Sequence, residues 1–289
     1  MCSVVLKSLN LSDNMSSEKN PTDRPIFIFA SGQRCGSTLL QRLLNSNSDI
    51  LIWGEQHGYL NGFLREYRGL LEWESEYSKH REVFIRDGYD NFVANMLPES
   101  HDLEKAAIDH IVAIFGMPAI KLGRTIWGFK EVRYDSQIAL FLQRCFPTAR
   151  FIHLTRNIIN CFISLKHWEN AAGPWNRSWT EMFIEDWKRI NTSFLNMVDK
   201  IPHLLRIKYE NMVANPKDFI GQLSHFLEIS PDSVDYRVFN KKLHRGDLIG
   251  SVDSRPLILS SDLTAEERYL LSKESIIEIS KEYGYRVEF

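Results

Sequence analysis

The chain has 289 residues, of which 44% are hydrophobic and 25% are charged, and its formal net charge is −2. This balance is typical of a globular protein and excludes a general attraction for nucleic acid, so any anion site must depend on local basic clusters. The four cysteines form no CxxC motif and no zinc-like pairing with histidine, which argues against a disulfide framework and against a zinc site.

No apolar run reaches membrane-spanning length, and the N-terminal region contains no clear signal-peptide core. We therefore expect a soluble, cytoplasmic protein whose partners include neither a membrane nor nucleic acid; the oligomeric state stays open. Residues 1–24 are mostly polar and predict a flexible arm. Residues 25–289 predict a single domain.

Apolar, β-branched runs alternate with amphipathic segments along the chain. The predicted strands cover residues 26–30, 50–53, 125–130, 150–155 and 204–209. The predicted helices cover residues 36–45, 80–96, 103–115, 136–145, 158–169 and 178–200, with two more that begin at Pro216 and at the capping box of Thr264 and Glu267. This alternation predicts an α/β fold of the P-loop type, with three layers in which helices flank a central parallel sheet.

The first predicted strand leads into a glycine-bearing loop and then into a helix. The loop residues that we expect to bind an anion are Gly32, Gln33, Arg34, Cys35, Gly36, Ser37 and Thr38. The N–H groups at a helix start, with the positive end of the helix dipole, favour a phosphate-like group. The segment is not a Walker A motif, because no lysine precedes the two hydroxyl residues and Arg34 supplies the cation instead.

Ionisable or aromatic side chains follow the other predicted strands. In chain order these are Glu55 and His57, Lys130, Arg156, and Tyr209. Because parallel sheets bind ligands at the carboxyl ends of their strands, we expect these side chains to lie near the anion loop. The fourth strand ends in Thr155 and Arg156, where a Walker B motif has a magnesium-binding aspartate. This difference counts against the alternative of a P-loop kinase-like phosphotransferase.

Three segments resemble the family of sulfotransferases that use 3′-phosphoadenosine 5′-phosphosulfate (PAPS) as donor. Residues 32–40 are similar to the 5′-phosphosulfate loop, in the arginine-containing version of bacterial and tyrosylprotein members. Residues 156–164 are similar to the 3′-phosphate motif, although Ile158 and Asn160 depart from its proline and acidic positions. Residues 208–216 are similar to a third family segment, which begins with Tyr-Glu. The resemblance implies PAPS as donor, PAP as product and no metal.

The resemblance also assigns roles to these residues. The loop, with Arg34, would hold the 5′-phosphosulfate, and Arg156 with Ser164 would hold the 3′-phosphate. Eight residues make a little over two helical turns, so these two side chains can lie on one side of the helix. Tyr209 would contact the nucleotide. The basic residues that match the family's C-terminal closing segment loosely are Lys241, Lys242 and Arg245.

For catalysis, the resemblance implies Glu55 as the general base and Lys130, with Arg34, as cations at the leaving oxygen. Burial would have to raise the pKa of Glu55 above its ordinary value of about 4.3 for this role. His57 is the rival base, since histidine titrates near neutrality. A third reading makes Glu55 a structural partner of Arg34 or Lys130. His153, inside an apolar strand, is expected to be a core residue.

The segment after the 3′-phosphate motif is rich in tryptophan and carboxylate side chains: Trp168, Glu169, Trp175, Trp179 and Glu181. These aromatics are either core residues or a lid over the acceptor. The expected function is transfer of a sulfuryl group from PAPS to a hydroxyl or amine of a small molecule, such as a natural product. The alternatives are a tyrosylprotein-type sulfotransferase, a kinase-like phosphotransferase and a non-catalytic nucleotide-binding protein.

Overall fold

A computed structural model describes residues 23–169, 175–240 and 263–289 of the chain. The strands are β1 (Ile26–Ala30), β2 (Ile50–Trp53), β3 (Ile126–Glu131), β4 (Arg150–Thr155) and β5 (Leu204–Lys208). The α-helices are α1 (Ser37–Asn45), α2 (Tyr59–Asp87), α3 (Ser100–Ile111), α4 (Met117–Lys121), α5 (Ser136–Cys145), α6 (Ile158–Glu169), α7 (Arg177–Met197), α8 (Tyr209–Ala214), α9 (Pro216–Leu227), α10 (Ala265–Leu271) and α11 (Glu274–Glu282). Short 3₁₀ turns and one π-helical turn, Val112–Gly116, complete the described elements.

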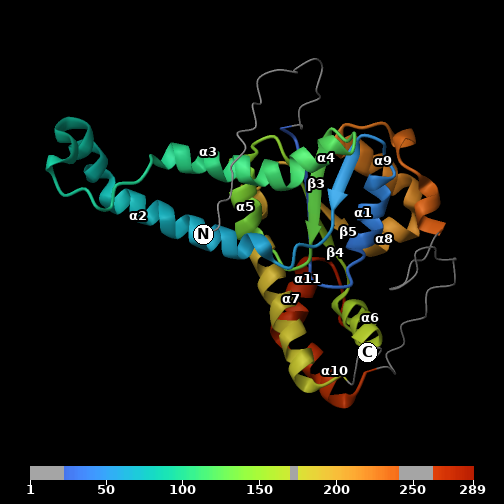
Figure 1. Ribbon diagram of the computed structural model, residues 1–289. Helices are drawn as coiled ribbons and strands as arrows, with labels where there is room; N and C mark the ends of the chain where they lie inside the picture. The colour runs from blue at the N-terminus through green and yellow to red at the C-terminus, as the bar shows by residue number, and fades with distance from the viewer. Residues whose placement is uncertain (1–22, 170–174, 241–262) are drawn as a thin grey trace, which may run out of the picture.

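The five strands form one parallel sheet in the order β2-β3-β1-β4-β5. Helices pack on both faces of this sheet (Figure 1), which confirms the predicted three-layer α/β architecture. All five predicted strands are present, and β3 and β5 differ from their predicted ends by one residue each. Strand β1, which leads into the predicted anion loop, is the central strand.

The side chains of β1 alternate between two hydrophobic cores, as the pleat of a strand requires. Phe27 and Phe29 belong to the core beneath α2, α3 and α5. Ile26, Ile28 and Ala30 belong to the core on the opposite face, beneath α1, α6 and α9. Because both faces are covered, β1 is apolar along its whole length and completely buried.

Helix α7 contributes to both cores and therefore crosses the end of the sheet. Phe183 and Trp187 pack into the core with α1 and α6, whereas Ile190 and Phe194 pack into the other core. This position brings the N-terminal half of α7 close to the loop that follows β1. None of the helices within residues 23–169, 175–240 and 263–289 is both long and apolar enough to cross a bilayer.

The helix predicted over residues 80–96 is wrong in both bounds. The observed helix α2 begins at Tyr59 and ends at Asp87, and it extends with α3 as an arm away from the sheet (Figure 1). Gly88 ends the helix because its φ of 65° lies outside the helical region. Sequence analysis did not predict the first half of α2. Only a few of its side chains, including Leu60 and Leu64, are buried, so the apolar pattern that indicates a helix is weak there.

Other predicted features agree more closely. Thr264 and Glu267 form the predicted capping box at the start of α10, and the side chain of Asn215 caps α9 ahead of Pro216. The predicted N-terminal arm lies outside the described residues up to residue 22.

Candidate active site

The carboxyl ends of the strands meet at one edge of the sheet. In the parallel register Phe29 pairs with Glu131, Ala30 with Leu154 and Thr155 with Lys208. The loop after β1 therefore lies between the segments that follow β3 and β4. The residues that follow the strands therefore lie at the same edge of the sheet as this loop.

The loop itself is shaped by a left-handed residue at the start of α1. Gly36 is the N-cap of α1 with a φ of 88°, and no side chain within the described part of the chain caps the first turn. A Cβ at this position would lie 2.5 Å from Cε2 of Tyr209, so the ring packs where only a glycine fits. The first N–H groups of α1 are consequently left to an anion or to water.

Two arginines of the predicted donor site lie together. Arg34 donates through Nε to the hydroxyl oxygen of Ser164 at 3.2 Å, and Arg156 donates through Nη1 to the carbonyl oxygen of Arg34 at 2.7 Å. The Arg156 guanidinium also lies 4.3 Å from the centre of the Tyr209 ring. Burial, and then the positive charge of Arg156, lower the pKa of Arg34. An anion between these guanidinium groups would relieve their repulsion.

A second charged group surrounds Glu55. Its Oε1 accepts a hydrogen bond from Lys130 Nζ at 2.5 Å, and its Oε2 accepts from Arg133 Nη1 at 2.9 Å. The side chain of Lys130 is 6% exposed and that of Glu55 is 37% exposed. Partial burial opposes ionisation of Glu55, but hydrogen bonds and charges from Lys130 and Arg133 outweigh it and lower its pKa. The pKa of Glu55 is therefore lowered, whereas the role of a base requires a raised pKa. The ion pair with Lys130, which was the alternative reading of Glu55, is present.

Sequence analysis did not select Glu131, which organises this region. Its carboxylate is completely buried and accepts backbone N–H bonds from Gln56, Gly58 and Val132 at 2.8–3.0 Å. Arg133 adds an ion pair at 3.0 Å. The available signal was an acidic residue that ends an apolar strand, a position where burial demands several partners. Glu131 therefore holds the loop after β2 in place, including Glu55.

The remaining predicted residues have different surroundings. His57 is exposed and has a φ of 55°. The ion pairs that Glu55 forms are with Lys130 and Arg133. In the loop, Gln33 and Thr38 are exposed, whereas Ser37 is buried. The residues predicted to close over the 3′-phosphate, namely Lys241, Lys242 and Arg245, lie outside the described residues.

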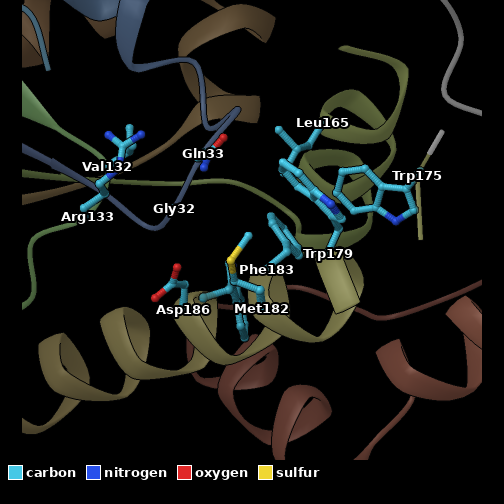
Figure 2. A pocket seen from close by; sticks show the side chains of 11 residues that line it. Gly32, Gln33, Val132, Arg133, Leu165, Trp175, Trp179, Met182, Phe183 and Asp186 are labelled. Carbon is cyan, nitrogen blue, oxygen red and sulfur yellow. The ribbon is translucent and has the colours of Figure 1, made fainter. Parts of the chain in front are cut away.

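A cavity of about 80 Å³ lies beside the anion loop (Figure 2). Its walls come from the loop after β1, the residues that follow β3, helix α6, and helix α7 with the segment before it; they are Gly32, Gln33, Val132, Arg133, Leu165, Trp175, Trp179, Met182, Phe183, Asp186 and Trp187. This volume suits only the reacting end of an acceptor, because pockets for whole drug-sized ligands measure about 300–1,000 Å³.

Two of the predicted acceptor aromatics line this cavity. Trp175 donates through Nε1 to Thr180 Oγ1 at 2.8 Å and packs edge-on against the buried Phe162, so it has a core role as well. Trp179 is 42% exposed. Glu181, in contrast, pairs with Arg177 at 2.8 Å. Residues 170–174 and the side chains of residues 168 and 169 lie outside what the structure describes.

The C-terminal segment also packs at this edge of the sheet, which sequence analysis missed. The hydroxyl of Tyr285 lies 3.0 Å from Thr155 Oγ1 and donates to Glu210 Oε2 at 3.0 Å. Asn157 donates through Nδ2 to the carbonyl oxygen of Arg286 at 2.9 Å. These contacts hold the chain end beside the residue that follows Arg156.

His153 is completely buried and stacks on Phe194 with ring centres 4.1 Å apart, as expected of a core residue. Residues 23–169, 175–240 and 263–289 contain no cluster of three or more His, Cys, Asp or Glu side chains placed to hold a metal ion.

The central strand of the parallel sheet leads into a loop that contains two glycines and Arg34. The profile of the sulfotransferase family matches residues 25–233, and the chain belongs to that family. No curated protein sequence matches the chain.

Two solved structures resemble the whole fold. The sulfotransferase domain of the olefin synthase from Synechococcus PCC 7002 has a TM-score of 0.51 and 17% identity, over 95% of this chain and 99% of that one. The sulfotransferase domain from the curacin biosynthetic pathway has a TM-score of 0.50 and 18% identity, over 93% of this chain and 100% of that one. At these identities the likeness concerns the fold.

Proposed function

We propose that this protein transfers a sulfuryl group from PAPS to a hydroxyl or amine of a small-molecule acceptor. The observation that carries the proposal is the convergence of Arg34, Arg156 and Ser164 around the uncapped start of α1. Two guanidinium groups and a helix N-terminus are suited to a polyanionic nucleotide, whose phosphate and sulfate groups accept several hydrogen bonds at once.

In the proposed complex, the N–H groups of the loop after β1 hold the 5′-phosphosulfate, together with Ser37 and Thr38. Arg156 and Ser164 hold the 3′-phosphate, and the Arg156 guanidinium rests over the face of the Tyr209 ring. Arg34 joins these two sets, since it belongs to the loop after β1 and contacts both Ser164 and Arg156.

Sulfuryl transfer, like phosphoryl transfer, has a loose transition state, so positioning and charge stabilisation supply most of the catalysis. The acceptor oxygen or nitrogen attacks sulfur in line with the bridging oxygen, which leaves with the electron pair of the broken bond. Lys130 and Arg34 stabilise the negative charge on that oxygen.

Glu55 is the proposed base that takes the acceptor proton. Its carboxylate is ion-paired with Lys130 and Arg133 in the protein alone, and this pairing makes it a weak base. The oxygens of a bound sulfuryl group compete for Lys130, which would weaken that ion pair and raise the pKa of Glu55. His57 remains the rival base.

The cavity beside Gly32 and Gln33 is the proposed acceptor site because it opens between the anion loop and α7. Its walls are mainly apolar and aromatic, and Asp186 and Arg133 supply the charged groups. These walls favour a planar acceptor with a polar or cationic end. A natural-product acceptor and a cytoplasmic location stay predictions from the sequence.

Calorimetric titration of the purified chain with PAP, and separately with ATP and magnesium, tests the donor. We expect metal-independent PAP binding with a Kd of about 1 μM or tighter, comparable with other nucleotide sites. Arg156→Ala should abolish it, whereas Arg237→Ala is the matched control, because Arg237 forms an exposed ion pair with Asp235 within the described part of the chain.

Binding of ATP with magnesium, with PAP ignored, would contradict the proposal and favour a kinase-like phosphotransferase. Tight PAP binding without turnover on any of a panel of alcohols, phenols and amines would instead favour a non-catalytic nucleotide-binding protein.

A further inference from the structure

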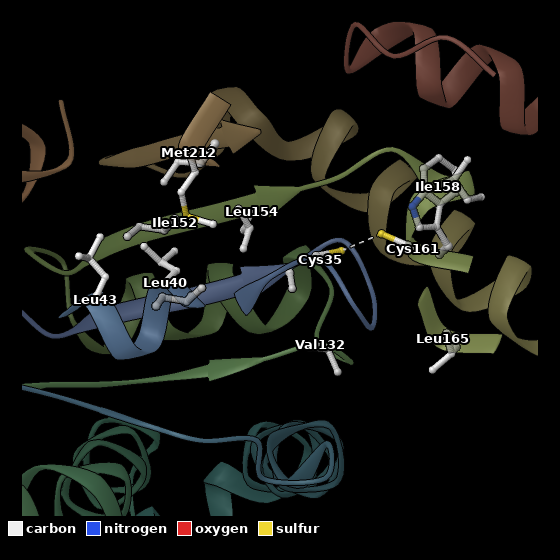
Figure 3. Close-up of a cluster of buried hydrophobic side chains, with 14 of the residues drawn as sticks. Cys35, Leu40, Leu43, Val132, Ile152, Leu154, Ile158, Cys161, Leu165 and Met212 are labelled. Carbon is white, nitrogen blue, oxygen red and sulfur yellow. Dashed lines mark hydrogen bonds between the residues drawn. The ribbon is translucent and has the colours of Figure 1, made fainter. Parts of the chain in front are cut away.

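Two cysteines lie in contact beneath the donor site. The Sγ atoms of Cys35 and Cys161 are 3.6 Å apart, and neither residue is exposed to solvent (Figure 3). Cys35 belongs to the anion loop after β1, and Cys161 belongs to α6. The contact joins two segments that are 126 residues apart in the sequence.

Each thiol lies next to a residue of the proposed donor site. Cys35 stands between Arg34 and Gly36, and its Sγ is 3.0 Å from the hydroxyl oxygen of Ser31. Cys161 stands between Arg156 and Ser164 on the chain, and its thiol points at the carbonyl oxygen of Arg156 at 4.0 Å. A change in the distance between the two sulfur atoms would therefore act directly on the anion loop.

The two thiols differ in acidity. Burial opposes ionisation of Cys35, but hydrogen bonds from Cys161 and Ser31 and the charge of Arg156 outweigh it and lower the pKa of Cys35. Burial and the hydrogen bond to Cys35 raise the pKa of Cys161. Cys35 is thus the more nucleophilic sulfur, and Cys161 is the protonated donor beside it. Gln33 and Arg34, which precede Cys35, are exposed, so a small loop displacement admits a small oxidant.

We propose that Cys35 and Cys161 are an oxidative modification site, at which a peroxide forms a reversible disulfide between the anion loop and α6. The Cys35 thiolate attacks one peroxide oxygen, which breaks the O–O bond and gives a sulfenic acid and water after protonation. The sulfur of Cys161 then attacks the sulfenic sulfur, releases a second water and forms the S–S bond. Two thiols are oxidised, and one hydrogen peroxide is reduced to two waters.

The disulfide changes the shape of the anion loop. A disulfide has an S–S length of about 2.05 Å, so the sulfur atoms must approach by roughly 1.5 Å from their present contact. Cys35 would move toward α6 and away from Ser31, taking Arg34 and Gly36 with it. Gly36 packs tightly against the Tyr209 ring, so it cannot shift toward that ring when Cys35 moves. The backbone of the loop must therefore take a different path. We expect a tenfold or greater loss of PAP affinity, and this consequence rests on the proposed function.

The first test is peptide mapping of the full chain after treatment with hydrogen peroxide, without reductant. We expect a Cys35–Cys161 disulfide, its reversal by dithiothreitol, and slower formation when PAP is bound. The double variant Cys2→Ser, Cys145→Ser keeps the pair and should oxidise like the wild type. Cys161→Ala and Cys161→Ser should form no Cys35–Cys161 disulfide, so Cys35 should stop at the sulfenic acid, which dithiothreitol reverses; using both variants guards against a folding defect in either one.

The second test is PAP calorimetry before and after oxidation. A Cys35–Cys161 disulfide with a tenfold weaker PAP affinity, restored by dithiothreitol, supports the proposal. Absence of that disulfide, or a disulfide that leaves PAP affinity unchanged, overturns it. If the reduced protein fails to bind PAP, the proposed function fails, whereas the peptide map still decides whether the modification site exists.

Discussion

The Nε atom of Arg34 donates a hydrogen bond to the hydroxyl oxygen of Ser164 at 3.2 Å and joins the anion loop to α6 across 130 residues of sequence. Arg156 completes this junction through its hydrogen bond to the carbonyl oxygen of Arg34. The groups that we assign to the 5′-phosphosulfate and to the 3′-phosphate are therefore connected before any nucleotide binds. Such a preorganised junction lowers the cost of ordering the site around the donor.

Ser164→Ala should weaken PAP binding about tenfold, because a hydrogen bond to a charged group contributes about 1.5 kcal/mol. Calorimetry measures the change, and thermal unfolding checks that the fold persists. Ser78→Ala is the matched control, since its exposed hydroxyl donates to the carbonyl oxygen of Ser75 in α2. An unchanged PAP affinity in Ser164→Ala would remove this serine from the donor site.

Gly36→Ala should damage both stability and PAP binding. The new Cβ would overlap the Tyr209 ring, and alanine disfavours a φ of 88°. Strain and overpacking together predict a loss of about 3 kcal/mol in the free energy of unfolding, measured by denaturant titration. Gly69→Ala lies in α2 with open space around it and should be neutral or stabilising. Equal effects of the two substitutions would refute the close packing on Tyr209.

Glu55→Gln should lower stability at pH 7, because Lys130 is nearly buried and loses its charged partner. The pKa of Glu55 is depressed in the folded state, so its contribution is present above the ordinary value of about 4.3 and disappears as pH falls below that value. Glu55 is partly exposed, and solvent screening limits the effect to about 1 kcal/mol.

Denaturant titrations of wild type and Glu55→Gln between pH 3 and pH 7 measure this difference. The two stability curves should converge at the acidic end. Glu66→Gln is the control, because its ion pair with Arg65 is largely exposed and should contribute little at any pH. A constant difference between wild type and Glu55→Gln across the whole range would contradict a titrating ion pair.

His153 should make the protein less stable in mild acid. Burial first, and the charge of Arg206 second, lower its pKa from 6.5 to about 3. The unfolded chain therefore binds a proton that the folded chain excludes, and stability falls as pH decreases from about 6.5 toward 3. At pH 5 this amounts to about 2 kcal/mol relative to pH 7.

His153→Phe should remove this slope while keeping a ring against Phe194. Unfolding by urea at pH 7 and pH 5 compares the two proteins, with His101→Gln as an exposed-histidine control that should keep the wild-type slope. Equal losses in wild type and His153→Phe would mean that other groups cause the acid sensitivity.

The sequence by itself predicted the features that depend on residues close to one another along the chain. The apolar run of β1, the glycines after it and the leucines of α1 are local signals, and each element formed where expected. The spacing of Arg156 and Ser164 likewise predicted two side chains on one side of α6. Both now contact Arg34, directly or through its backbone. Family membership also followed from such short segments.

Only the tertiary structure decided which distant groups meet. The strand order placed β3 beside β2, and this pairing brought Lys130 and Arg133 to Glu55. These two cations lower the pKa of Glu55, whereas the base role needs a raised pKa. Chain folding also brought Cys161 to Cys35 and Tyr285 to Thr155. Sequence analysis offered Lys130 as one possible partner of Glu55, but it predicted neither the cysteine pair nor the contact of Tyr285. Contacts between distant segments depend on how whole helices and strands pack, whereas sequence periodicity indicates only which face of each one is apolar.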